Sequence, residues 1–225
     1  MLDLANHLFH RKSSATPRVF TIYRMSPRDA AARIAELGSF VDPVDFSKVE
    51  HLHICEREIP ANFADMVAGM APETVTLNGA LMTASDIAAL LHFPSLRGIV
   101  AHHMDFASTL LPAIVKSSDL RSIAMSHTSI TDTDVTVLAN RSGLTSIHFA
   151  GTRLTDIAMT TFGTLPDLEL LDVSDTHVTN DGLHQLRDLR NLFTINARGT
   201  SVTADGANGF RRLVANSLPD VEVLV

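Results

Sequence analysis

A 24-residue repeat fills the second half of this chain and constrains its fold more than any other feature. Three consecutive segments share one pattern: LRSIAMSHTSITDTDVTVLANRSG from Leu120, LTSIHFAGTRLTDIAMTTFGTLPD from Leu144 and LELLDVSDTHVTNDGLHQLRDLRN from Leu168. A fourth, longer segment opens at Leu192 and runs to the closing sequence VEVLV. A fixed period of this length indicates a solenoid, in which each unit packs only against its neighbours.

Each unit predicts one strand and one short helix when its residues are numbered from the first leucine. Positions 1, 4 and 6 are apolar, and positions 4 and 6 share one face of an extended chain. The threonine at position 9 can satisfy backbone groups of a turn, and the threonine at position 12 is a good helix N-cap. Apolar residues at positions 16 and 19 then form a helical stripe. The threonines are Thr128, Thr152, Thr176 and Thr200 at position 9, and Thr131, Thr155, Thr179 and Thr203 at position 12.

The pattern LxxLxLxxTxxTD resembles a leucine-rich repeat, with THVTNDGL from Thr176 to Leu183 as the best copy. It is closest to the variant with Thr in place of Asn or Cys, and nearest the cysteine-containing and ribonuclease-inhibitor-like branches. The units here are shorter and lack the cysteine of those branches. The resemblance implies an α/β solenoid with a curved parallel sheet on the concave side and short helices on the convex side.

The same frame extends backwards from Leu120, which predicts the domain organisation. Units fit from Leu96, from Pro72 and, one residue short, from Val49. We therefore expect six to seven units over residues 49–225, ending in a terminal strand. Residues 1–48 do not repeat and are predicted to form a helix, a linker and a strand–helix cap, since a solenoid needs its apolar ends covered. A small independent helical adaptor is the alternative for this segment.

Charge and composition limit the class of partner. Residues 1–48 carry a net charge of +2 and residues 49–225 a net charge of −9, which together give the −7 of the whole chain. An acidic repeat body is a poor match for nucleic acid, whose binding depends on clustered Lys and Arg. No apolar run approaches the ~20 residues that span a membrane, and a single cysteine excludes an internal disulfide framework. We expect a cytoplasmic protein that binds neither nucleic acid nor membrane.

The repeat frame also predicts which side chains face the concave side, namely those at positions 3, 5 and 7. The middle of that face is small and weakly polar, while its two ends carry the chemically reactive and charged side chains. Such a surface suits a protein or peptide partner, although simple solvation of each residue is the alternative. The candidate partner-binding residues are His102, His148, Asp172, Asn196 and Arg198, with Phe193 at the rim.

Histidine is abundant, with 11 in the chain, and two groups invite a further hypothesis. His51, His53 and Cys55 alternate along a predicted strand and are metal-ligand types. Their spacing of about 6.5–7 Å per step places the third ligand too far for an undistorted tetrahedron, so a metal site is the minor interpretation. His102, His103 and His127 lie on neighbouring units and either form a pH-responsive patch or are incidental.

Nothing in the sequence indicates catalysis. No phosphate-binding loop, dinucleotide-binding glycine pattern, HExxH or GxSxG motif occurs. Cys55 lies too far along its strand from His53, and two strands from His102, for a nucleophile and base in contact. We predict a non-catalytic interaction module or scaffold that needs no cofactor. The alternatives are a metal-binding or metal-sensing protein, and a homodimer that pairs through the C-terminal edge strand.

Overall fold

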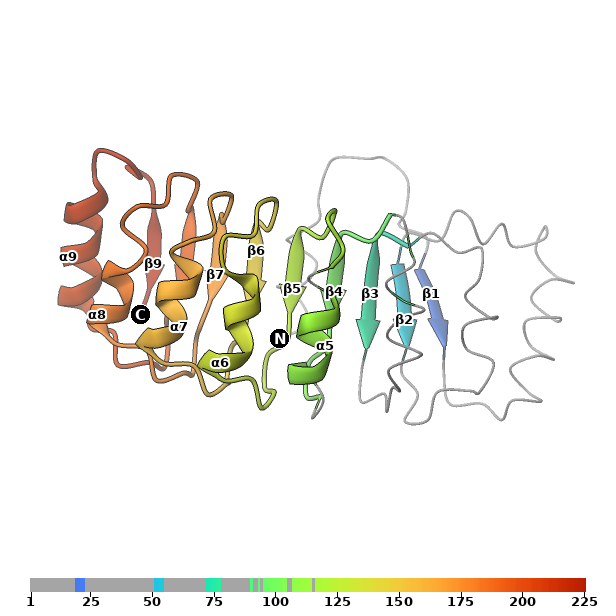
Figure 1. Cartoon of the computed structure of the whole chain (residues 1–225). Coiled ribbons are helices and arrows are strands. Elements are labelled where there is room, and N and C mark those ends of the chain that lie inside the picture. The colour runs from blue at the N-terminus through green and yellow to red at the C-terminus, as the bar shows by residue number, and fades with distance from the viewer. Residues whose placement is uncertain are drawn as a thin grey trace, which may run out of the picture.

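The repeat folds into a single row of parallel strands. The computed structural model describes residues 19–22, 51–54, 72–77, 90, 93, 95–104, 107–114 and 116–225. Within them, nine strands form one sheet in chain order, as Figure 1 shows. The strands are β1 Val19–Ile22, β2 His51–Ile54, β3 Thr74–Leu77, β4 Gly98–Val100, β5 Ser122–Ala124, β6 Ser146–His148, β7 Leu170–Asp172, β8 Thr194–Asn196 and β9 Glu222–Leu224.

Strand pairing follows the repeat frame without a slip. Ser122 of β5 pairs with Ser146 of β6, which pairs in turn with Leu170 of β7. The same register runs back through Gly98 to Thr74, so the frame extended from Leu96 and Pro72 is confirmed. Because each strand pairs with the same position of the next unit, residues one 24-residue period apart lie side by side from β3 to β8.

The predictions for residues 1–48 have different outcomes. The strand predicted within residues 1–48 is confirmed as β1, which pairs with β2 through Val19 and His51. The helices predicted near the N-terminus and after Ser26 lie outside the described residues, and the boundary at residue 48 stays a prediction.

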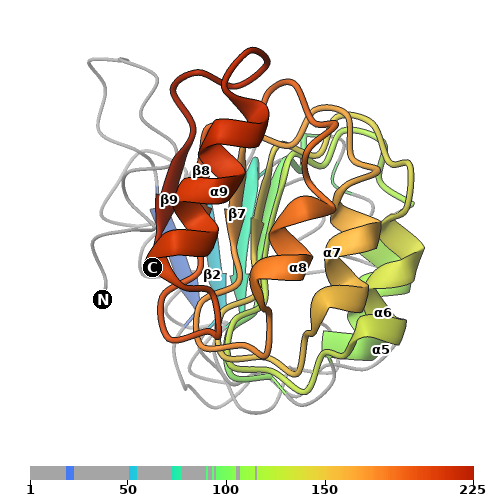
Figure 2. The same ribbon diagram turned by 90° about the vertical axis from the view of Figure 1, so that its left-hand side faces the viewer.

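The described helices lie on one side of the sheet, as the end-on view in Figure 2 shows. They are α5 Ala107–Ile114, α6 Asp132–Val135 continued by the 3-10 turn η2 Thr136–Leu138, α7 Asp156–Phe162, α8 Asn180–His184 and α9 Ala204–Val214. Each returns the chain from one strand to the next parallel strand. The predicted solenoid, with strands on one side and short helices on the other, is confirmed.

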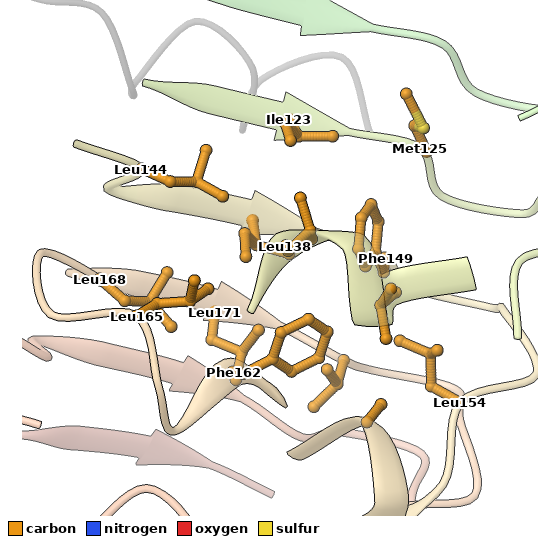
Figure 3. Packing of buried hydrophobic residues seen from close by; sticks show 14 of the residues in the cluster. Ile123, Met125, Leu138, Leu144, Phe149, Leu154, Phe162, Leu165, Leu168 and Leu171 are labelled. Carbon is orange, nitrogen blue, oxygen red and sulfur yellow. The ribbon is translucent and has the colours of Figure 1, made fainter. Parts of the chain in front are cut away.

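The core lies between the strands and the helices. Positions 4 and 6 of each unit point into it, so Ile123, Met125, Ile147 and Phe149 have no exposed surface. Residues from the helices meet them from the other side, and Figure 3 shows Leu138 and Phe162 packed against this strand layer. The rings of Phe149 and Phe162 are 6.1 Å apart between centroids. The alternation that predicted the strands therefore also identified the buried face.

The position-9 threonines form the predicted column of buried or half-buried hydroxyls. Each donates a hydrogen bond to the carbonyl of position 6 in its own unit. Thr128 reaches Met125 at 2.8 Å, and Thr152 reaches Phe149 at 2.6 Å. Thr176 and Thr200 repeat the contact with Val173 and Ala197. These bonds close the turn that follows each strand.

The position-12 threonines cap the helices and also join neighbouring units. The hydroxyl of Thr179 accepts a hydrogen bond from the N–H of Asp181 at 3.2 Å, which caps α8 as predicted. The same hydroxyl donates to Asp156 of the preceding unit at 2.6 Å, and the N–H of Thr179 donates to the other oxygen of that carboxylate at 2.8 Å. One threonine therefore starts its own helix and binds the previous one.

This arrangement recurs along the stack, and we call it the Thr–Asp ladder. Asp132 accepts both bonds from Thr155, at 2.8 and 2.7 Å. Asn180 takes the same place toward Thr203. Thr131 also forms a capping box, with Asp134 accepting from the Thr131 N–H at 2.8 Å. The sequence signal for the ladder is Asp or Asn at position 13.

Gly182 makes room for the ladder. A Cβ at this position would lie 2.3 Å from the Oδ1 of Asp156 and 3.1 Å from the Cγ of Met159. The carboxylate of Asp156 could then not keep its place against Thr179. The glycine in the sequence NDGL is thus explained by the close approach of the preceding unit.

We predict that Asp156→Ala lowers the free energy of unfolding by roughly 1.5–3 kcal/mol, because it removes two hydrogen bonds to a carboxylate. Urea titration followed by circular dichroism measures this change. Asp188→Ala is the matched control, since the Asp188 side chain is 73% exposed in an ion pair with Arg187. An equal loss of stability in both variants would contradict the ladder.

Candidate functional site

A polar row crosses the side of the sheet that faces away from the helices, which we call the strand face. His148, Asp172 and Asn196 are paired with one another in register on β6, β7 and β8. All three are half-buried, while their neighbours in the chain, Ile147, Leu171 and Ile195, are fully buried on the core side. Three of the predicted partner-binding residues are thus brought together on adjacent strands.

Hydrogen bonds fix the orientation of this row. The Nε2 of His148 lies 3.0 Å from the Oγ of Ser146 on the same strand. The Nδ1 of His148 lies 3.9 Å from the Oδ2 of Asp172. The other carboxylate oxygen of Asp172 accepts from the N–H of Ser174 at 2.9 Å and from its hydroxyl at 2.7 Å. The side chains are therefore held in place before any ligand arrives.

The carboxyl group of Asp172 is held in its ionised form. Burial by itself would raise the pKa, but the adjacent His148 side chain and hydrogen bonds from Ser174 and Asn196 outweigh it and lower the pKa from its ordinary value of 3.8. Asp172 therefore presents a fixed negative charge on the strand face near neutral pH.

The remaining candidates on β8 lie at its two ends. Arg198 follows the strand, is exposed, and its N–H donates to the Oδ1 of Asn196 at 3.4 Å. Phe193 precedes the strand and is 62% exposed. Arg198 thus adjoins the polar row, whereas Phe193 lies at the opposite end of the strand, in keeping with its predicted place at the rim.

The middle of the strand face is less open than the frame predicts. Ser122, Ala124 and Ser146 keep only 6%, 7% and 8% of their surface exposed. Such short side chains stand low between strands that lie about 4.8 Å apart. The larger polar side chains further along the face, from His148 to Arg198, supply most of the exposed polar surface on this part of the chain.

Histidines gather at the carboxyl ends of β4 and β5. The rings of His103 and His127 are stacked, with centroids 4.9 Å apart and planes 5° apart, and both residues are exposed. The Nδ1 of His102 accepts a hydrogen bond from the N–H of Ser126 at 3.0 Å. The predicted proximity of His102, His103 and His127 is confirmed.

Burial is the main cause of a lowered pKa at His102. The positive charges that His103, His148 and His127 carry when protonated lower it further below the ordinary 6.5. His102 thus favours its neutral form, which leaves Nδ1 free to accept the Ser126 bond.

Position 8 of the repeat adopts the left-handed conformation, a constraint that the hydrophobic pattern does not show. His103, His127 and Asp175 have φ of 56°, 56° and 54°, and Gly151 and Gly199 have 63° and 69°. Glycine and short polar residues adopt this conformation at the lowest cost. A Cβ on Gly151 would lie 2.3 Å from the Nδ1 of His127, so side chains at position 8 lean over the next unit. In the sequence, this conformation is indicated by the residues found at position 8 of successive units, which are His, His, Gly, Asp and Gly.

The metal hypothesis gains no support from the described part of the chain. No group of three or more His, Cys, Asp or Glu residues there is placed to hold a metal ion. Of the predicted ligands, His51 is half-buried on β2, where His53 also lies, and Cys55 lies outside the described residues. In the ranges that the structure describes, no helix is long and apolar enough to cross a membrane.

Comparison with known proteins gives structural neighbours only. No family model matches the chain, and no curated protein does. An internalin from Listeria monocytogenes has a TM-score of 0.49 and 17% identity, over 81% of this chain and 56% of that protein. A protein from Bacteroides fragilis has a TM-score of 0.38 and 13% identity, over 93% of this chain and 74% of its own. This chain thus spans little more than half the length of the internalin.

Because both TM-scores lie below 0.5, the fold assignment depends on the chain's own geometry. Three features decide the fold. From β5 to β8 the strands pair in register at one period, each strand is followed by a turn threonine at position 9, and each is followed by a capped helix on the same side of the sheet. The chain has a leucine-rich-repeat fold. The nearest branch of leucine-rich repeats stays a prediction.

We predict that the protein loses stability as the pH falls through 6.5. The folded chain holds His102 with a lowered pKa and so binds fewer protons than the unfolded chain, which favours unfolding in acid. The contribution is fully present above pH 6.5 and declines below it. Thermal melts between about pH 8 and pH 5 measure it.

His102→Asn should flatten this part of the profile, whereas His184→Asn on α8 should retain it because His102 is still present. An unchanged slope in His102→Asn would assign the pH dependence to other groups.

Proposed function

We propose that this protein binds another protein or peptide through the strand face of its leucine-rich repeats. The observation that carries the proposal is the polar row of His148, Asp172 and Asn196, whose side chains are partly exposed and held by hydrogen bonds. Side chains fixed in this way lose little conformational entropy on binding. A rigid surface with a few anchors needs no bond-making step and no cofactor.

Asp172 on β7 and Arg198, which follows β8, give the surface charges of both signs. Asp172 is partly buried, so a partner must place a matching group at a defined position to reach it. Arg198 is exposed, so its charge can speed the encounter with a partner of opposite charge. Phe193 adds exposed aromatic surface, which is common at protein interfaces. A peptide with a basic group for Asp172 and an acidic group for Arg198 fits this arrangement. A cytoplasmic location belongs to the same proposal.

We expect the double variant Asp172→Ala/Arg198→Ala to lose peptide binding at least tenfold, because truncation of central charged anchors costs about 2 kcal/mol or more. Peptides selected from a displayed random library against the wild-type chain provide the ligand. Affinity is then measured by fluorescence polarisation.

The control double variant, Asp188→Ala/Arg187→Ala, removes the same charges from an exposed pair after α8 on the helix side. Equal losses in both double variants, or a loss only in the control, would place the binding surface elsewhere.

A homodimer through β9 is the second proposal, and one contact opposes it. The guanidinium of Arg211 on α9 donates to the carbonyl of Val223 at 2.6 Å, at the outer edge of the strand. A carbonyl that already accepts a hydrogen bond from Arg211 is not available to a second strand that pairs with this edge.

Arg211→Ala frees this carbonyl and should therefore increase self-association. Sedimentation velocity at about 10 and 200 μM measures it, with the exposed Arg212→Ala as control. A monomer in every variant would remove this proposal.

A further inference from the structure

The polar row contains a serine, a histidine and an aspartate in chemically meaningful order. The Oγ of Ser146 lies 3.0 Å from the Nε2 of His148, and the Nδ1 of the same ring faces the Oδ2 of Asp172 at 3.9 Å. The strand places Ser146 and His148 two residues apart on one face, and strand pairing places Asp172 directly beside His148. The order is that of a nucleophile, a base and the group that orients the base.

The surroundings of Asp172 support this division of roles. Its Oδ1 is occupied by the N–H and the hydroxyl of Ser174, which leaves Oδ2 toward the imidazole. A carboxylate on that side favours the tautomer with the proton on Nδ1. The Nε2 then has a free lone pair toward Ser146, and its role as acceptor follows from the hydrogen-bond network. The 3.9 Å separation is longer than a hydrogen bond, and such contacts often tighten only when a substrate binds.

We propose that Ser146, His148 and Asp172 form an acyl-transfer site that accepts acyl groups from activated esters. The Ser146 oxygen forms a bond to the acyl carbon, and its proton passes to Nε2 of His148. The bond to the leaving alcohol breaks, and the alcohol takes that proton. Water then adds to the acyl-serine with His148 again accepting its proton, and the carboxylic acid and free serine are released.

The strand geometry restricts the substrate class. The N–H of Ser146 donates to the carbonyl of Arg121 at 3.1 Å, so it is committed to the sheet and cannot stabilise a developing oxyanion. Without that donor, the site needs an electrophile whose leaving group departs readily, such as an aryl ester. Ser146 keeps 8% of its surface exposed and His148 keeps 14% of its side-chain surface, so small acyl groups fit this entrance better than large ones.

The sheet supplies an internal control for this chemistry. Ser122 lies beside Ser146 on the preceding strand and is similarly exposed, at 6% against 8%. The residue beside His148 on that strand is Ala124. The two serines therefore share position, backbone and burial, and differ in whether a base stands two residues further along the strand.

A fluorophosphonate probe tests the proposal directly. Attack by Ser146 forms an O–P bond, breaks the P–F bond, releases fluoride and passes the serine proton to His148. We expect peptide mass spectrometry to find the label on Ser146 and not on Ser122. Loss of the base in His148→Gln should slow labelling on the order of 100-fold. Asp172→Asn should slow it less, and Ser122→Ala should leave the rate unchanged.

Two further readouts separate chemistry from folding. Thermal melts establish that each variant is folded before its labelling rate is compared with that of the wild-type chain. Release of p-nitrophenol from p-nitrophenyl acetate should show the same order of variants.

Equal labelling of both serines, or an unchanged rate in a folded His148→Gln protein, would overturn the proposal. So would the absence of any label on Ser146. Peptide binding is measured separately, so the binding function can stand or fail by itself.

Discussion

The bond between a threonine and the carboxylate of the preceding unit is the interaction on which this solenoid depends. Thr179 accepts a hydrogen bond from its own helix and donates two to Asp156, through its hydroxyl and its N–H. The start of one helix and its attachment to the previous helix are thus a single contact. A unit that fails to stack leaves its helix without a complete cap, which couples local folding to assembly. Without that coupling, helices of four to eight residues from α5 to α8 would have little reason to form.

The same constraint creates the strand face. Because neighbouring units are held in one register, position 5 of β6 lies beside position 5 of β7 and of β8. Residues that are far apart in the chain, such as His148 and Asn196, become parts of one surface. The polar contacts between them are therefore a product of the stack and not of any single unit. The chemistry of the face depends on the identity of one residue per period.

The sequence was sufficient for the strands, the turn bonds and the helix caps that repeat in each unit. Alternation identified the strands and the buried residues, and the threonines at positions 9 and 12 predicted the turn bonds and the caps. Side-chain contacts between units could not be predicted from the sequence, because a period shows which residues become neighbours but not how their side chains meet. The bridge from Asp156 to Thr179, the stacked rings of His103 and His127, and the Ser146–His148–Asp172 contacts belong to this class. The left-handed conformation at position 8 has its own signal, the column His, His, Gly, Asp, Gly, which the alternation of apolar residues does not show.

The Thr–Asp ladder repeats with the period of the units, and this limits the lengths by which the chain can grow or shrink. Thr155, Thr179 and Thr203 occupy equivalent places, and so do Asp132, Asp156 and Asn180. Loss or duplication of one whole period would bring a threonine opposite an equivalent oxygen, so the joint between units would close again. An insertion or deletion of only a few residues would instead move each later threonine away from its hydrogen-bond partner in the preceding unit. The architecture therefore tolerates growth and shrinkage in steps of one unit, and the composition of the strand face would change with each step.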